Sequence, residues 1–161
     1  MTNAHSSNNE ILIRDFFTAM AEKDFKKMNH CYSPEVIYYN PICDLLKEES
    51  VFARWEVECK SRKDLQLSFD PVVALDEDYF TCKFEMKYTF LPTGKYIRQV
   101  STAHMKISDG KIIEHSDAFS VHRWAIQAYG FTGWIFGWNR FYQQSVKNAF
   151  RKNLIDFFNG K

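Results

Sequence analysis

Residues 80–90 read FTCKFEMKYTF, and this stretch decides the fold. Its apolar side chains occupy every second position, while Thr, Lys and Glu fill all the positions between them. Successive side chains of a β-strand point to opposite faces, so a period of two predicts a long strand with one buried face and one wetter face.

The residues on both sides extend this strand into a meander. Residues 91–94 (LPTG) form a predicted turn, and Tyr96 to Ile107 is the next predicted strand. The Ser-Asp-Gly run at 108–110 is a tight hairpin turn of the Asp-Gly type, and it predicts a last strand from Lys111 to His122. Residues 65–69 alternate in the same way. We therefore predict a four-stranded antiparallel meander.

Helical spacing dominates the N-terminal part of the chain. Ser7 and Glu10 have the S-x-x-E form of a capping box, and an apolar stripe at helical spacing follows over residues 9–22. Asp24 can cap a second short helix that runs through Cys31. Two helices are therefore expected before the first strand.

A short strand from Val36 to Asn40 is stopped by Pro41, which cannot donate a backbone hydrogen bond. Residues 48–60 form a third predicted helix, and we place Arg54 and Glu58, four residues apart, on its outer side. After the meander, an aromatic segment with three glycines leads into a final helix that ends near Phe158.

Composition and charge bear on the number of domains and on the partners to expect. The chain has 161 residues, 45% of them hydrophobic, which suits one domain with aromatic surface left to line a cavity. A formal net charge of +1 gives no overall attraction to nucleic acid or to an anionic membrane, so neither is expected as a partner.

The cysteines and the termini bear on the cellular location. Cysteines at 31, 43, 59 and 82 lack the C-x-x-C spacing of a zinc or redox site, so we expect free thiols in a reducing compartment. Residues 1–9 are polar, unlike a signal peptide, and the apolar patch at 131–138 is too short to span a bilayer. A cytoplasmic location is therefore expected.

Three stretches in this order carry a resemblance to a known superfamily. They are the amphipathic helix over 13–24, the strand that ends in Tyr39-Asn40-Pro41, and the run DGKIIEHSD at 109–117. Because these stretches follow one another along the chain, the chain resembles the nuclear transport factor 2-like superfamily, and within it the SnoaL-like proteins related to polyketide cyclases and ketosteroid isomerases. The resemblance implies an α+β fold in which a cone-shaped, curved antiparallel sheet packs on N-terminal helices. It implies one domain over 1–161, with 124–161 as a C-terminal helical extension.

Ketosteroid isomerase chemistry needs a carboxylate base and two acidic donors for the oxyanion. At the positions that the resemblance assigns to these roles, the chain has Asn40, Phe16 and Ala103. None of these side chains can exchange a proton at neutral pH. This activity is therefore excluded.

The SnoaL-type cyclases imply a different pair, an Asp on the last strand and a His on the preceding strand. Asp117 and His104 are the candidates for these catalytic roles. Asp117 shares its strand face with His115 and Phe119, so burial is expected to raise its pKa. The alternative is that Asp117 is a buried structural acceptor. Strict alternation turns His104 to the outer face unless a bulge intervenes.

Several aromatic and polar side chains are candidates for contact with a ligand. They are Tyr32, Tyr38, Asn40, Trp55, Tyr88, His115 and Phe119, and they would give polar tips to an apolar cavity. This combination favours a small, hydrophobic, oxygen-bearing molecule and proton-transfer chemistry without a cofactor or metal. The alternative is that these side chains only fill the core.

Two other functions remain open at this level. The first is a non-catalytic dimerisation or protein-interaction domain of the same fold, in which the aromatic tail is the working surface; a homodimer is the expected assembly. The second is epoxide hydrolysis, for which the resemblance implies an Asp–Arg–Asp arrangement. Asp117 and Arg98 would supply two of its members, and the sequence shows no third acid.

Overall fold

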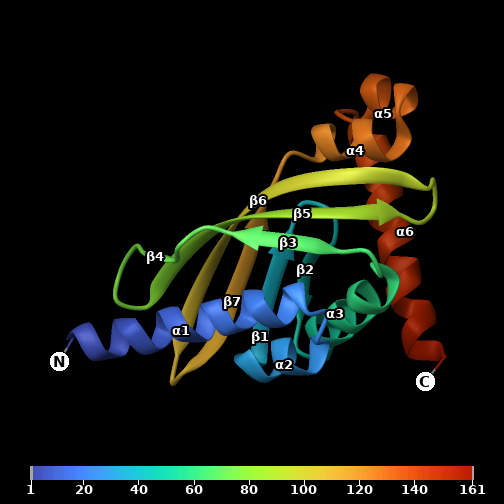
Figure 1. Ribbon diagram of the computed structural model, residues 1–161. Helices are drawn as coiled ribbons and strands as arrows, with labels where there is room; N and C mark the ends of the chain where they lie inside the picture. The colour runs from blue at the N-terminus through green and yellow to red at the C-terminus, as the bar shows by residue number, and fades with distance from the viewer. Residues whose placement is uncertain (1, 161) are drawn as a thin grey trace.

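A computed structural model describes residues 2–160, with side chains from residue 7 onward (Figure 1). In chain order the helices and strands are α1 (Thr2–Ala21), α2 (Phe25–Cys31), β1 (Tyr32–Asn40), β2 (Asp44–Lys47), α3 (Glu49–Ser61), β3 (Gln66–Phe69), β4 (Val73–Ala74), β5 (Tyr79–Phe90), β6 (Lys95–Ser108), β7 (Lys111–Ala118), α4 (Val121–Tyr129), α5 (Phe131–Phe136) and α6 (Arg140–Asn159). The predicted α+β class with a curved sheet and an extra C-terminal helix is confirmed.

The sheet has seven strands in the order β2-β1-β7-β6-β5-β3, with β4 paired to β5. Its centre is the long antiparallel ladder of β5 and β6, which runs from Tyr79 opposite Lys106 to Phe90 opposite Lys95. The alternation that predicted β5 is confirmed, because its even-numbered side chains from Phe80 to Tyr88 are buried against the helices. The meander therefore forms as expected.

The pairing of β1 with β7 departs from a purely antiparallel sheet. These two strands run parallel, with Tyr38 beside His115. The last strand also ends earlier than predicted, at Ala118, because Ser120 caps α4 by accepting a hydrogen bond from the Arg123 backbone N–H. His122, which we had placed on the strand, lies in α4.

Two of the expectations for the helices need correction. Since α1 already begins at Thr2, Ser7 lies inside the helix and does not cap it. The predicted cap of α2 is confirmed, with the Asp24 side chain accepting from the Lys27 backbone N–H. In α3, Arg54 and Glu58 face inward and are only 4% and 9% exposed, so their assignment to the outer side was wrong.

The C-terminal helices close one end of the sheet. α4 packs against β6, and α6 runs back to contact α3 (Figure 1). Lys147 and Arg151 on α6 form ion pairs with Asp44 on β2, at 2.5 and 3.1 Å. All four cysteines are free thiols, as expected. Within residues 2–160, no helix combines the length and the apolar character needed to cross a membrane.

Candidate functional site

A cavity of about 540 Å³ lies inside the fold, between α3, the concave face of the sheet and the C-terminal helices. Its volume is within the range that small-molecule sites usually have. Its wall includes polar side chains from β1, α3 and the sheet, and apolar side chains from β5, α4 and α6. These include Asn40, Arg54, Glu58, Arg62, Met86, Tyr88, Phe90, Gln99, Asp117, Phe119, Trp124, Val146, Phe150 and Leu154.

Asp117 on β7 is, with Glu58, one of two buried carboxylates in this wall among the described residues, and 5% of its surface is exposed. Tyr38 donates its hydroxyl hydrogen to Oδ2 at 2.5 Å, and His115 Nε2 lies 2.9 Å from Oδ1. Burial raises the pKa of Asp117, but the contact with His115, the positive charge of Arg54 and the hydrogen bond from Tyr38 outweigh it and hold the pKa below its usual value of 3.8. The expected rise was therefore wrong, and Asp117 is an anion at neutral pH.

His115 is held from behind by a second tyrosine. Its Nδ1 lies 2.6 Å from the Tyr32 hydroxyl, which in turn accepts a hydrogen bond from Trp55 Nε1 at 3.1 Å. With hydrogen on Nε2, His115 donates to Asp117 and accepts from Tyr32, so every polar hydrogen of this chain of contacts has a partner. The network therefore fixes the orientation of the Asp117 carboxylate.

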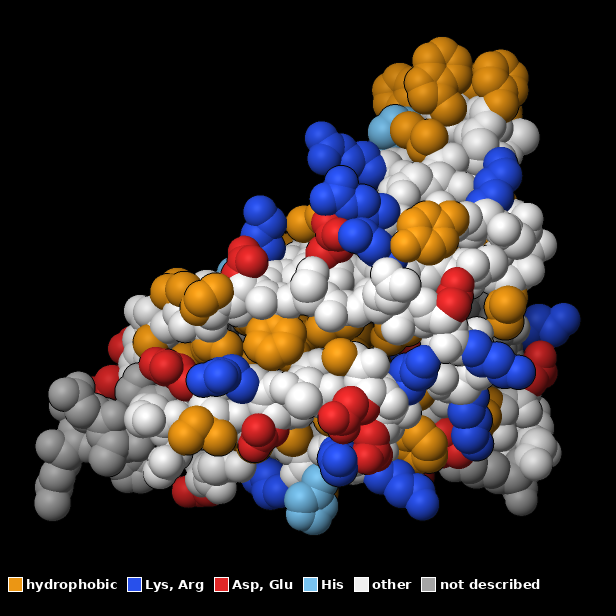
Figure 2. All heavy atoms as spheres, viewed as in Figure 1, with side chains coloured by type: hydrophobic (Ala, Val, Ile, Leu, Met, Phe, Trp, Pro, Cys, Tyr) orange, Lys and Arg blue, Asp and Glu red, His pale blue; other side chains and the backbone are white. Residues whose placement is uncertain are grey.

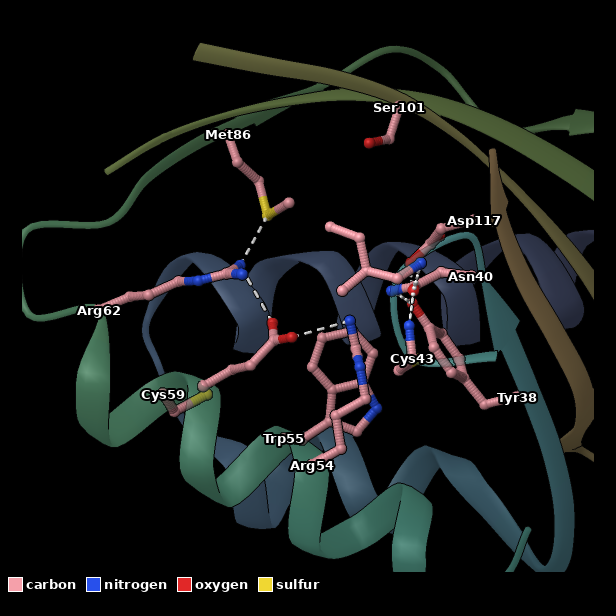
Figure 3. Close-up of polar contacts among 12 residues, drawn as sticks. Tyr38, Asn40, Cys43, Arg54, Trp55, Cys59, Arg62, Met86, Ser101 and Asp117 are labelled. Atoms are coloured by element: carbon pink, nitrogen blue, oxygen red, sulfur yellow. Dashed lines mark hydrogen bonds and ion pairs between the residues drawn. The ribbon is translucent and has the colours of Figure 1, made fainter. Parts of the chain in front are cut away.

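Asn40 has an amide whose orientation is set by the backbone. Its Oδ1 accepts hydrogen bonds from the N–H groups of Ile42 and Cys43, at 2.9 and 2.7 Å, and its Nδ2 donates to the Tyr38 hydroxyl at 3.0 Å. Among residues 7–160 the second Nδ2 hydrogen has no acceptor, and Asn40 lines the cavity beside Asp117 (Figure 3). The pair thus presents a carboxylate and an amide donor to the same space.

Three charged side chains, two on α3 and one at the residue that caps its C-terminal end, form a row along the cavity (Figure 3). Glu58 lies between Arg54 and Arg62, with its Oε1 2.9 Å from Arg54 Nη2 and its Oε2 3.0 Å from Arg62 Nη1. The contact between Arg62 and Glu58 is an ion pair whose angles do not suit a hydrogen bond. Glu58 Oε2 therefore has no hydrogen-bond donor among the described residues. The row carries two positive charges and one negative charge.

Arg54 is the most buried member of this row. Its guanidinium lies 4.2 Å from the centre of the Tyr38 ring and 3.9 Å from that of Trp55. Burial opposes the charge, but Glu58 and the other acidic groups around it outweigh burial and raise the pKa of Arg54 above its usual value. Within the described residues its Nε and Nη1 have no hydrogen-bond acceptor, and the ring faces take their place.

The opposite wall holds a second polar chain, between β5, β6 and α4. Trp124 Nε1 donates to the Tyr88 hydroxyl at 3.0 Å, Tyr88 donates to Gln99 Oε1 at 3.2 Å, and Gln99 Nε2 donates to Ser101 Oγ at 3.1 Å. These contacts fix Tyr88 and Gln99 in the cavity wall.

The predicted site residues divide into three groups. Asn40, Tyr88, Asp117 and Phe119 line the cavity, whereas Tyr32, Tyr38, Trp55 and His115 lie behind it and hold Asp117. The third group is His104, which lies outside the site.

Two predicted residues lie outside the site. His104 is exposed on the outer face of β6, one register position from Ala103, the partner of Asp117, so it does not pair with that carboxylate. Arg98 is also on the outer face and binds Glu85 at 2.6 Å. Gln99 and Ser101 occupy the inward positions of that strand, so the Asp–Arg–Asp arrangement of an epoxide hydrolase is not present there.

The sequence interpretation missed the charged row of α3. Arg54, Glu58 and Arg62 are spaced four apart, and this spacing is also typical of a solvent-exposed ladder of ion pairs. No signal in the sequence separates the two cases, because Phe52, Trp55 and Cys59 already give this helix an apolar stripe at helical spacing. The histidine partner of Asp117 was also misassigned, because His115 lies two residues away on the same strand.

Comparison with known proteins agrees with this architecture. Among solved structures, the chain is similar to a proposed polyketide cyclase from Xanthomonas campestris pv. campestris (TM-score 0.65, 16% identity, 77% of this chain and 98% of that chain). It is also similar to TsrD from Streptomyces laurentii (TM-score 0.65, 20% identity, 78% and 97%). A third structure is SalBIII, described as an epoxide hydrolase/cyclase-like enzyme in pyran ring formation in the polyether salinomycin (TM-score 0.64, 10% identity, 74% and 94%).

Sequence comparison adds the family. No curated protein sequence matches the chain significantly. The family model for the SnoaL-like domain matches residues 13–115, which include α3 and end two residues before Asp117. Because this match spans more than half of the chain, the protein belongs to the SnoaL-like domain family.

Proposed function

We propose that the protein binds a small, hydrophobic, oxygen-bearing molecule in this cavity and catalyses proton transfer on it without a cofactor. The observation that carries the proposal is the ionised Asp117 carboxylate, which is buried in the wall of a largely apolar cavity of about 540 Å³. A solid interior would instead have favoured a purely structural role for this carboxylate.

Asp117 acts as the base in this proposal. Its lowered pKa keeps it ionised at neutral pH, so it accepts a proton and does not start as the donor. The same lowering makes it a weak base, so the C–H bond that it attacks must itself be acidic, as it is beside a carbonyl group. Isomerisation, cyclisation and dehydration of carbonyl compounds all begin with such a step.

Asn40 and Tyr38 have supporting roles. The free Nδ2 hydrogen of Asn40 donates to the carbonyl oxygen, where negative charge develops as the proton leaves. Burial raises the pKa of Tyr38 well above its usual value, so Tyr38 stays protonated and continues to hold the Asp117 carboxylate. The names of the similar cyclases fit this class of chemistry and support the proposal.

Solvent exchange tests this proposal without knowledge of the natural substrate. In D2O at neutral pD, the protein is expected to accelerate deuterium uptake at the activated carbon of 2-tetralone, followed by NMR. Asp117→Asn should reduce the acceleration at least about 100-fold, in line with the loss of a general base. His104→Asn, on the outer face, is the matched control and should exchange at the wild-type rate. Equal rates for Asp117→Asn and the wild type would show that Asp117 is not the base.

A separate observation favours a second function, self-association through the C-terminal helices. Figure 2 shows hydrophobic side chains gathered at the end of the molecule that α5 forms. Phe131, Trp134, Trp138 and Phe141 are between 58% and 85% exposed there. Water-exposed aromatic clusters of this kind are typical of contact surfaces.

Sedimentation equilibrium tests this second function. The wild-type protein is expected to form a homodimer, and Trp134→Ser combined with Trp138→Ser should give a monomer. Leu75→Ser is a matched control, because Leu75 is an equally exposed apolar residue outside this cluster. A dimer that survives the double substitution would exclude the aromatic surface as the contact.

A further inference from the structure

Arg62 is the member of the α3 row whose charge the protein compensates least. Arg54 has Glu58, the attraction of Asp117 and two aromatic faces around it. Arg62 shares the same Glu58 at 3.0 Å, has one aromatic face beside it, that of Tyr88, and donates to the Met86 sulfur at 3.6 Å. A thioether is a weak acceptor, so the contact with Met86 compensates little of the charge.

The remaining N–H groups of Arg62 are open to the cavity. Across residues 7–160, the structure gives this guanidinium an ion pair with Glu58 and a hydrogen bond to the Met86 sulfur, and both involve Nη1. The Arg62 side chain lines the cavity and is 19% exposed, whereas Arg54 is nearly fully enclosed. Nε and Nη2 therefore present two parallel donors, the fork that binds a carboxylate in bidentate geometry.

Packing holds this fork in a fixed place. The guanidinium carbon lies 4.1 Å from the centre of the Tyr88 ring, and Tyr88 is itself held by hydrogen bonds with Trp124 and Gln99. Figure 3 shows Arg62 reaching from the C-terminal end of α3 toward Met86, and Glu58 pairs with both Arg54 and Arg62. A ligand anion would therefore meet an oriented partner and would not have to order a flexible side chain.

The rest of the wall sets the shape of such a ligand. Phe90, Phe119, Trp124 and Phe150 supply an apolar surface that suits a ring system. Arg62 follows Arg54 by eight residues, or about 12 Å along the helix, and Asp117 interacts with the Arg54 end of the row. A molecule of two or three rings spans this distance.

We propose that the cavity takes an apolar carboxylic acid, with its carboxylate bound by Arg62 and its ring body directed toward Asp117. This inference rests on the proposed function only in requiring that the cavity binds a small molecule. It names the substrate class, which the proton-transfer step leaves undefined.

Two probes of equal shape test the inference by isothermal titration calorimetry at neutral pH and low salt. They are biphenyl-4-carboxylic acid, which is an anion under these conditions, and the neutral biphenyl-4-carboxamide. The wild-type protein is expected to bind the acid at least about tenfold more tightly than the amide, as a charge-assisted hydrogen-bonded pair predicts. Arg62→Gln should abolish this preference, because it weakens the binding of the acid and leaves the binding of the amide unchanged.

Two further variants complete the test. Arg62→Lys keeps the charge without the fork, so it should retain part of the preference even if Arg62→Gln folds poorly. Arg98→Gln removes an arginine of the outer face and should bind both probes as the wild type does. Equal binding of acid and amide by the wild type, or a preference that survives Arg62→Gln, would overturn the inference and leave the cavity as a ligand site. Binding of neither probe would count against both the inference and the small-molecule function.

Discussion

Tyr38 on β1 and Asp117 on β7 are joined by a hydrogen bond of 2.5 Å between two buried side chains. The residues are far apart in the sequence, and the parallel pairing of their strands brings them together. A hydroxyl that donates to a buried carboxylate stabilises the charged form of that carboxylate. The functional state of the site therefore depends on a contact between the first and last long strands of the sheet.

Removal of this hydroxyl should destabilise the fold and change the carboxylate. For Tyr38→Phe, we expect the free energy of unfolding to fall by about 1.5–3 kcal/mol, because a buried charged acceptor loses a donor. The pKa of Asp117 should rise for the same reason. Urea denaturation and NMR titration of the carboxyl carbon measure the two effects. Tyr39→Phe, at a half-exposed position of the same strand, is the control and should change neither quantity.

Asp117 should make stability depend on pH in the acidic range. The pKa of Asp117 is lower in the folded protein than in the unfolded chain, where it is about 3.8. The stabilisation from the ionised carboxylate is therefore complete above the unfolded pKa and is lost as the pH falls through the folded pKa. The difference in free energy of unfolding between the wild type and Asp117→Asn should therefore stay constant from neutrality down to the unfolded value of about 3.8 and shrink only as the pH falls below it. Urea titrations at a series of pH values test this, and a difference independent of pH would contradict the ionised state.

Arg54 should be essential to the charge balance of the cavity. Arg54→Gln leaves Glu58 and Asp117 with less positive charge around them in a buried site, so a loss of about 3–5 kcal/mol is expected. Thermal and urea unfolding measure it. Arg98→Gln breaks an ion pair on the outer face and should have little effect, since water already screens that pair. Similar losses for the two variants would contradict the distinction between the buried row and the surface pair.

Gly133 should be required for the close approach of α5 to α4. A Cβ atom at this position would lie 1.9 Å from the backbone oxygen of Ala125, so Gly133→Ala must push the two helices apart. We expect a loss of about 1–3 kcal/mol and faster proteolysis within residues 130–139. Gly160→Ala meets its nearest atom, a backbone oxygen, at 3.4 Å and is the control. Unchanged protease resistance in Gly133→Ala would show that the helices can separate without cost.

The elements of the fold were largely predictable because their signals are local. The alternation from Phe80 to Phe90 predicted β5, the Asp-Gly turn at 109–110 predicted the β6–β7 hairpin, and Asp24 predicted the start of α2. The predictions failed where one local signal overrode another. Ser120 caps a helix where alternation alone would continue the last strand, and Asn40 binds the backbone of the turn that precedes β2, a strand we did not predict.

The site was predictable only in part. The position of Asp117 on the inner face followed from strand parity, and parity also placed His115 beside it. The inward direction of Arg54 and Glu58 did not follow, because a helical i,i+4 ion pair looks the same in the sequence whether it is exposed or buried. Only the neighbouring side chains decide whether such a pair can leave water.

The sequence by itself determined the periodicity of each segment, and with it the long strands, most of the helices and the face on which Asp117 lies. Only the tertiary structure decided which groups surround that carboxylate, whether its pKa rises or falls, and that Arg62 opens into a cavity. The physical reason is that periodicity is a property of consecutive residues, whereas desolvation and charge pairing depend on atoms that distant segments bring within a few ångströms.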